Sequence, residues 1–198
     1  MNEIKAEMIK CRSEIKPLYI PGGHNFKMGW EEYMGILANV RSEIEIFCRC
    51  DSHIHSDKRF VGHDEDGRSI LLYNKFDPVI FGVNRLSENI IKAEEYLKSI
   101  GIPLPGFKLI SNFVGYENTY GVHPDPHDVI SFNLLGNVEY RIFYNVAEKD
   151  YHTNTEEYEY TSYLLRPGDM IYMPKGLVHQ VVVSEPRITL VADFYSGF

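Results

Sequence analysis

The sequence predicts a mainly β protein of the α+β class, with a barrel or jelly roll over residues 106–198 and helices in the preceding part. Three observations favour this fold. Short apolar runs recur at regular spacing after Pro105, as in barrels and jelly rolls. The helical patterns all lie before Pro105. A length of 198 residues with 13% aromatic side chains fits one domain with a full core. We therefore expect a single domain, 1–198, in which residues 1–105 support the barrel.

Helical patterns occupy parts of the N-terminal region. Four apolar side chains of the first segment fall on one helical face: Ile4, Met8, Cys11 and Ile15. A second amphipathic stretch is "GWEEYMGILANVR". The clearest helix is "LSENIIKAEEYLKSIG", where Ser87 is the expected N-cap and Gly101 the expected C-terminal stop. Between these helices, "KRFVGHDEDGRSILLY" predicts two strands around an Asp-Gly turn.

Seven strands are expected after Pro105, in short apolar runs. They are "FKLISNFVGY", "DVISFNLLG", "EYRIFYNV", "YTSYLL", "DMIYMP", "LVHQVVV" and "RITLVADFY". Their aromatic and β-branched residues favour strands. The acidic segment "AEKDYHTNTEEYEY" between the third and fourth runs is expected to be a solvent-facing loop, with a lid or substrate wall as the alternative.

Charge and composition narrow the classes of partner. The net charge of -8 and the absence of a Lys/Arg run argue against a nucleic-acid partner. The N-terminus is too polar for a signal peptide, and no apolar run approaches the ~20 residues of a membrane span. The three cysteines argue against a disulfide framework. We expect an intracellular, cytoplasmic protein; the sequence does not decide between a monomer and a homodimer.

The stretch "HPDPHD", residues 123–128, is the first candidate for chemistry. Side chains two apart in a strand share a face, so His123 and Asp125 lie together and His127 extends that face. An imidazole and a carboxylate one pleat apart can grip a divalent metal. The alternative is a hydrogen-bonded pair in a loop. His127 fits a supporting or surface role better than that of a fourth ligand, and Asp128 is expected to support the turn.

A third ligand is available in "LRPGDMIYMPKGLVHQVVV". Its turns return His179 to the mouth of the barrel. Two histidines and one carboxylate on one face of a metal leave positions open, a geometry that suits non-haem Fe(II) with a co-substrate and O₂.

These two stretches together resemble the JmjC and cupin-like branch of the Fe(II)/2-oxoglutarate-dependent oxygenases. The resemblance covers about residues 107–194. The matching positions are His123, Asp125, Asp128-Val129, Gly136, Pro167-Gly168-Asp169, Tyr172, Pro174, Gly176 and His179. The resemblance implies a double-stranded β-helix with Fe(II) held by His123, Asp125 and His179 at one open end. It also implies 2-oxoglutarate and O₂ as co-substrates, and C–H hydroxylation with succinate and CO₂ as co-products.

In this family a cation in the barrel binds the far carboxylate of 2-oxoglutarate. Many JmjC-like members carry it on the strand after the Gly, where this sequence has Val138; Arg141 has the opposite parity. Arg187, with Thr189 on the same face, resembles the Arg-x-Ser/Thr arrangement of other branches. A surface cation at a strand end is the alternative for Arg187. Further hydrogen bonds to the co-substrate are expected from Tyr120, Asn112 and Tyr144.

A second group of metal-ligand residue types lies in "CRCDSHIHSD" and just beyond it: Cys48, Cys50, His53, His55, Asp57 and His63. By residue type this group could bind zinc. Its Cys-x-Cys spacing is not the usual knuckle gap and no second Cys pair follows, so the two cysteines fit a strand face at least as well.

Two functions are therefore weighed. The first is an oxygenase that acts on a small molecule, an amino acid, or a peptide or protein side chain, with a preference for amino-acid or peptide side chains. The second is a cupin-type barrel that binds a metal or ligand without 2-oxoglutarate turnover. A cation in the pocket would favour the first function, and a pocket lined by Val138 and aromatic side chains the second.

Overall fold

The computed structural model describes residues 3–39, 44–48, 53–55, 61–63, 69–71, 76–102, 105–113, 121–151 and 158–194. Within these residues the fold is mixed α and β, with two larger antiparallel sheets and a two-stranded hairpin, which agrees with the predicted α+β class. The helices are α1 (Glu3–Glu14), α2 (Trp30–Asn39) and α3 (Glu88–Ser99). None of the described helices is long and apolar enough to cross a membrane.

The larger sheet has eight strands among the described residues. Their order is β1 (Leu18–Ile20), β12 (Met170–Met173), β9 (Asp128–Leu135), β14 (Arg187–Phe194), β7 (Gly106–Asn112), β6 (Phe76–Phe81), β2 (Ile44–Cys48) and β3 (His53–His55). The smaller sheet has the order β11 (Tyr160–Leu165), β10 (Val138–Phe143), β13 (Val178–Val182) and β8 (His123–Pro124). The hairpin β4 (Val61–His63) with β5 (Ser69–Leu71) forms the predicted pair around the Asp-Gly segment.

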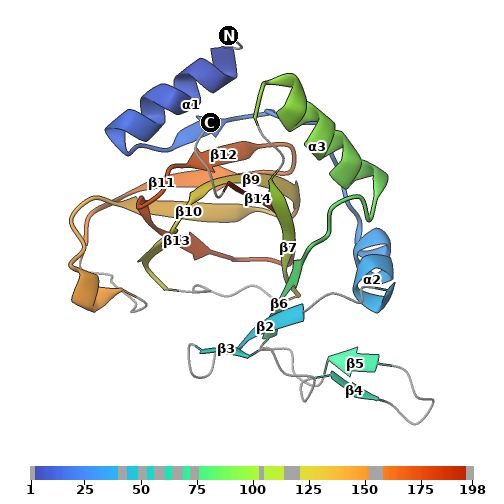
Figure 1. Ribbon diagram of the computed structural model, residues 1–198. Coiled ribbons are helices and arrows are strands. Elements are labelled where there is room, and N and C mark those ends of the chain that lie inside the picture. The colour runs from blue at the N-terminus through green and yellow to red at the C-terminus, as the bar shows by residue number, and fades with distance from the viewer. Residues whose placement is uncertain are drawn as a thin grey trace.

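All seven runs predicted after Pro105 contain strands, and in β14 the alternating side chains serve two buried faces. On β14, Ile188 and Leu190 pack with the helices, while Arg187 and Val191 face the space between the sheets. Every residue of β14 is buried. Figure 1 shows α1 and α3 on the outer side of the larger sheet. The core there joins Met8 of α1 and Leu97 of α3 to the sheet.

Helix α1 ends earlier than its apolar pattern predicts. Ile15 lies beyond the last turn, has φ +51° and is 55% exposed, so its assignment to the buried face is wrong. The amide of Ile15 donates to the carbonyl of Arg12 and the amide of Lys16 to that of Cys11, which is the Schellman pattern of a helix end. Pro17 follows and cannot continue the helix.

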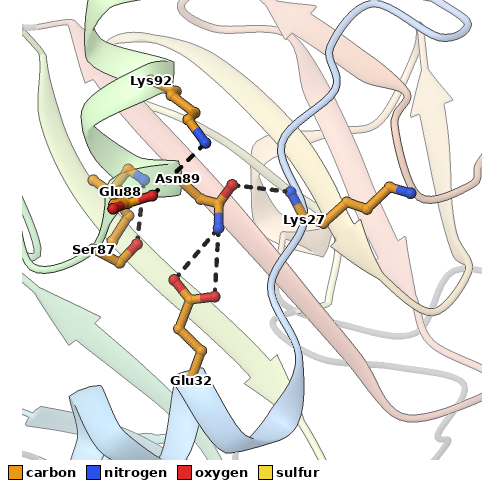
Figure 2. A network of polar contacts seen from close by, with 7 residues as sticks. Lys27, Glu32, Ser87, Glu88, Asn89 and Lys92 are labelled. Carbon is orange, nitrogen blue, oxygen red and sulfur yellow. Dashed lines mark hydrogen bonds and ion pairs between the residues drawn. The ribbon is translucent and has the colours of Figure 1, made fainter.

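The caps predicted for α3 are confirmed. Ser87 Oγ accepts a hydrogen bond from the amide of Ile90 at 3.3 Å, and Gly101 has φ +77° just after the helix. The neighbouring Asn89 ties α3 to other segments (Figure 2). Its Nδ2 donates to the Glu32 carboxylate on α2, and its Oδ1 accepts from the amide of Lys27 at 3.5 Å. These bonds fix α2 and α3 against each other.

Part of the acidic segment is also described. Residues Glu148–Asp150 form a short 3-10 helix, η2. The middle of the segment, 152–157, lies outside the described residues, so the choice between a loop and a lid stays a prediction. The division of the chain at residue 105 is likewise still a prediction.

Candidate metal and co-substrate site

His123, Asp125 and His179 come together at one point of the structure. His123 on β8 and His179 on β13 are direct partners across the smaller sheet, and Asp125 follows β8 at once. One ligand atom from each residue lies within 4.8 Å of the others. His179 Nε2 is 3.6 Å from Asp125 Oδ2, and the two imidazole centroids are 4.6 Å apart. The two distant halves of the sequence pattern therefore meet as predicted in space; their role as ligands stays a prediction.

Backbone carbonyls orient both imidazoles. Nδ1 of His123 lies 3.0 Å from the carbonyl oxygen of Gly121, and Nδ1 of His179 lies 3.0 Å from that of Leu177. A carbonyl oxygen can only accept a hydrogen bond, so Nδ1 carries the proton and Nε2 the lone pair in each neutral ring. Such bonds to the rear nitrogen are how proteins orient metal-binding histidines.

The donor set fits the predicted metal. Two imidazole nitrogens and one carboxylate oxygen suit a divalent first-row ion and leave positions for further ligands. This is the one group of His, Cys, Asp or Glu side chains with metal-ligand spacing among the described residues. The alternative zinc group cannot be compared with it: strands β2 and β3 pair Cys48 with His53, but the side chains of the group lie outside the described residues.

Arg187 is the first residue of β14. It is 2% exposed, so the alternative of a surface cation is wrong. Its Nε donates to Asn112 Oδ1 at 2.6 Å, and its Nη1 donates to Thr189 Oγ1 at 3.1 Å. Gly136 allows this packing, since a Cβ there would collide with the carbonyl oxygen of Pro186.

One pocket connects Arg187 to the metal cluster. Its volume is about 340 Å³, and its lining includes Arg187, His123, Asp125 and His179. Most of the remaining wall is apolar, with Val79, Phe81, Ile110, Val129, Met173, Val181 and Val191. A buried cation and a cluster of residues of metal-ligand type thus line the same pocket.

Comparison with known proteins gives the family. The sequence profile described as "JmjC domain" matches residues 92–196, more than half of the chain. The chain belongs to the JmjC domain family. No curated protein matches the sequence significantly.

Solved structures of the Escherichia coli ribosomal oxygenase YcfD share the fold of this JmjC domain. The structure with cobalt and succinic acid has a TM-score of 0.68 at 18% identity, and covers 92% of this chain and 49% of YcfD. The structure with cobalt and 2-oxoglutarate gives 0.65 at 16% identity, with the same coverage. A further YcfD structure gives 0.69 at 15% identity, over 100% of this chain and 54% of YcfD. The chain therefore spans about half the length of YcfD.

The other residues predicted to bind the co-substrate lie in three different settings. Asn112 and Thr189 are fully buried and contact Arg187, while the pocket wall is made by other residues. Tyr144 lies past the end of β10, is 54% exposed and is absent from the pocket wall. Tyr120 lies outside the described residues. The predicted outward direction of Arg141 agrees with its contacts to Glu139 and the ring of Tyr160.

Tyr140 and Ser131 line the pocket and were not predicted. The hydroxyl of Tyr140 is hydrogen bonded to the side chains of Ser131 and Arg187, and burial raises the pKa of Tyr140 above its usual value. The phenol therefore stays neutral and can donate a hydrogen bond. Strand parity carried the signal: Tyr140 is two residues after Val138, the position singled out as facing the barrel interior.

His127 also lines the pocket, but it is not one of the three clustered side chains. Its Nε2 lies 3.3 Å from Asp193 Oδ1, and Lys108 Nζ lies 3.0 Å from Asp193 Oδ2. Asp193 is buried at the end of β14. This arrangement fits the supporting role preferred for His127.

Proposed function

We propose that this JmjC domain is an Fe(II)- and 2-oxoglutarate-dependent oxygenase that hydroxylates a C–H bond and releases succinate and CO₂. One observation carries the proposal: the His123–Asp125–His179 cluster and the buried cation of Arg187 face one pocket. The alternative, a barrel that binds a metal or ligand without 2-oxoglutarate turnover, predicted a pocket without such a cation.

The strand order supports the finer description of the fold as a double-stranded β-helix. From β7 to β14 the strands divide between two facing sheets, in the orders β12-β9-β14-β7 and β11-β10-β13-β8. A double-stranded β-helix interleaves its strands in this way, and its open end would hold the metal cluster.

Each group of side chains has a distinct task in the proposed reaction. His123, Asp125 and His179 would hold iron, which supplies the O₂-dependent oxidation of the substrate when bound. Arg187 would bind the far carboxylate of 2-oxoglutarate; a charge-assisted hydrogen bond of this kind contributes about 1.5–3 kcal/mol. Tyr140 would add a neutral donor beside Arg187. The apolar wall would limit access of water to the reacting groups.

The proposed substrate is an amino-acid, peptide or protein side chain. YcfD is described as a ribosomal oxygenase, which makes a protein side chain the first class to test. The net charge of -8 argues against nucleic acid. A cytoplasmic location goes with this proposal.

An anaerobic titration tests the proposed co-substrate directly. The protein is loaded with Fe(II), and 2-oxoglutarate is added while the visible spectrum is recorded. The expected result is the weak charge-transfer band of the iron chelate of the keto acid. Bound metal without that band would refute 2-oxoglutarate as the co-substrate, and succinate formation with candidate peptides then identifies the substrate class.

A further inference from the structure

Two backbone turns lie next to the candidate metal ligands, and hydrogen bonds join these two turns to each other. The first, residues 125–128, contains Asp125; the second, residues 174–177, leads into His179. The amide of Gly176 donates to the carbonyl of Asp125 at 3.0 Å. The amide of Lys175 donates to Asp128 Oδ1 at 2.7 Å. Asp128 therefore connects the two turns through its side chain.

The carboxylate of Asp128 is buried, with a side-chain exposure of 1%. A buried carboxylate is costly unless a cation or hydrogen-bond donors compensate it. The cation is Arg12 of α1, whose Nε lies 3.2 Å from Asp128 Oδ2. Tyr172 lies beside them; its own burial, and then the Asp128 carboxylate, raise the pKa of Tyr172. A helix more than a hundred residues earlier in the chain thus reaches the back of the metal cluster.

We propose that Arg12 and Asp128 form a positioning pair that sets the spacing between Asp125 and His179, and so the affinity of the site for its metal. The inference rests on the proposed metal site. Without Arg12 the buried Asp128 carboxylate keeps the Lys175 amide but loses its cation, and the turn of residues 125–128 relaxes toward solvent. Asp125 moves with that turn, while His179 stays on β13, paired with β10. The pair touches no reacting group; it acts through the ligands.

The shape of helix α1 suits this role. Its C-terminal end is fixed by the Schellman bonds around Ile15, so the last turn that carries Arg12 is held in place. Met8 anchors the middle of α1 in the core. Arg12 is itself 39% exposed, so replacing it leaves the core intact and the variant protein folded.

Co(II) titration of the purified protein, followed by its visible absorption, tests the pair without turnover. Arg12→Gln and Asp128→Asn are each expected to weaken Co(II) binding about 10-fold, as changes to groups behind metal ligands do. Asn at position 128 keeps the acceptor for the Lys175 amide, so this variant isolates the lost charge. Arg12→Lys, which retains the charge, should recover most of the affinity. Lys10→Gln, on the exposed side of the same helix, is the matched control and should bind as the wild type does.

The double variant Arg12→Gln/Asp128→Asn sharpens the test. If the two residues act as a pair, it binds Co(II) no more weakly than Asp128→Asn alone. Wild-type Co(II) affinity in both single variants would overturn the inference. So would a loss of Co(II) affinity in the double variant equal to the sum of the two single losses. A merely structural pair would lower the thermal midpoint and leave the Co(II) affinity unchanged. A wild-type protein that binds no Co(II) would overturn the metal site and this inference together. Co(II) binding with no spectral response to 2-oxoglutarate would count against the proposed function alone.

Discussion

The two ends of the pocket are built differently. The end with Arg187 belongs to long paired strands: β14 has eight residues, and Arg187 is the register partner of Asn112 on β7. At the other end, His123 lies in β8, which has only two residues, and Asp125 follows that strand. Arg187, Asn112 and Thr189 are almost fully buried, whereas the Asp125 side chain is 21% exposed. The Arg187 end is thus fixed by sheet structure, whereas the end with His123 and Asp125 depends on bonds between turns.

This contrast predicts that the two ends can be disabled separately. At the metal end, a variant should lose metal affinity and activity together. At the Arg187 end, a variant should lose affinity for 2-oxoglutarate and keep its metal. Any variant that changed both affinities equally would contradict this division.

The largest effect is expected from His179→Ala. Changes behind a metal ligand cost about 10–100-fold in affinity, so loss of a ligand should weaken Co(II) binding by at least about 100-fold and abolish succinate formation. His127→Ala is the matched control: this histidine lines the same pocket but pairs with Asp193, and its variant should retain the metal. Co(II) titration and succinate assays check both, and turnover in His179→Ala would refute the ligand assignment.

Arg187→Lys tests the other end. Lysine keeps the charge but cannot reproduce the planar guanidinium fork. Loss of one charge-assisted hydrogen bond, about 1.5–3 kcal/mol, predicts at least about a 10-fold higher KM for 2-oxoglutarate. The affinity for Co(II) should stay unchanged. Arg141→Lys is the control, since Arg141 points away from the pocket toward Glu139. An unchanged KM in Arg187→Lys would remove Arg187 as the co-substrate anchor.

Tyr140→Phe should have a smaller effect at the same end. It removes a neutral hydroxyl next to Arg187, and a neutral hydrogen bond contributes about 0.5–1.5 kcal/mol. The KM for 2-oxoglutarate should rise by roughly 2–10-fold at an unchanged Co(II) affinity. Tyr144→Phe provides the comparison, because Tyr144 is exposed beyond the strand. Equal effects of the two substitutions would show that the pocket-facing hydroxyl does not contact the co-substrate.

The sequence was informative where a motif and strand parity agreed. The two halves of the motif together predicted one site, and so the sequence placed His123, Asp125 and His179 side by side. Parity also put Arg141 on the outer face, whereas Arg187 was proposed from its resemblance to the Arg-x-Ser/Thr arrangement of related branches. Strand parity could not tell which of the inward side chains line the pocket. Asn112 and Thr189 accept hydrogen bonds from Arg187 and do not line it. Tyr140 does line it.

Strand parity also fails where a strand ends. Tyr144 has the parity of Ile142, but it follows the last residue of β10 and turns to solvent. The same limit applies to helices, since Ile15 continues the spacing of the buried face but lies past the end of α1. Local pattern predicts which face a residue would occupy in a regular element, but it does not fix where that element stops; α1 stops at its own Schellman bonds.

The smallest effect concerns a region outside both ends of the pocket, around His24. Its Nδ1 accepts from the amide of Phe26 at 3.2 Å, and its Nε2 lies 3.0 Å from the carbonyl of Asp169. This arrangement suits the neutral ring, and burial lowers the pKa of His24. The unfolded chain therefore takes up a proton near pH ~6.5 that the folded protein does not. The neutral His24 therefore contributes to the free energy of unfolding above that pH. This contribution is lost as the pH falls below it, because protons then favour the unfolded chain.

His24→Gln should flatten this dependence, since glutamine does not titrate. Urea unfolding at about pH 7.5 and about pH 5.5 measures the free energy of unfolding at both sides of the transition. The wild-type protein should lose more stability on acidification than the variant does. The affinities for Co(II) and 2-oxoglutarate at the higher pH should match in the two proteins, because His24 contacts neither end of the pocket. Equal losses of stability in the wild type and the variant would mean that His24 is protonated as easily in the folded protein as in the unfolded chain. A changed affinity for Co(II) or 2-oxoglutarate would mean that the two ends of the pocket depend on the region around His24.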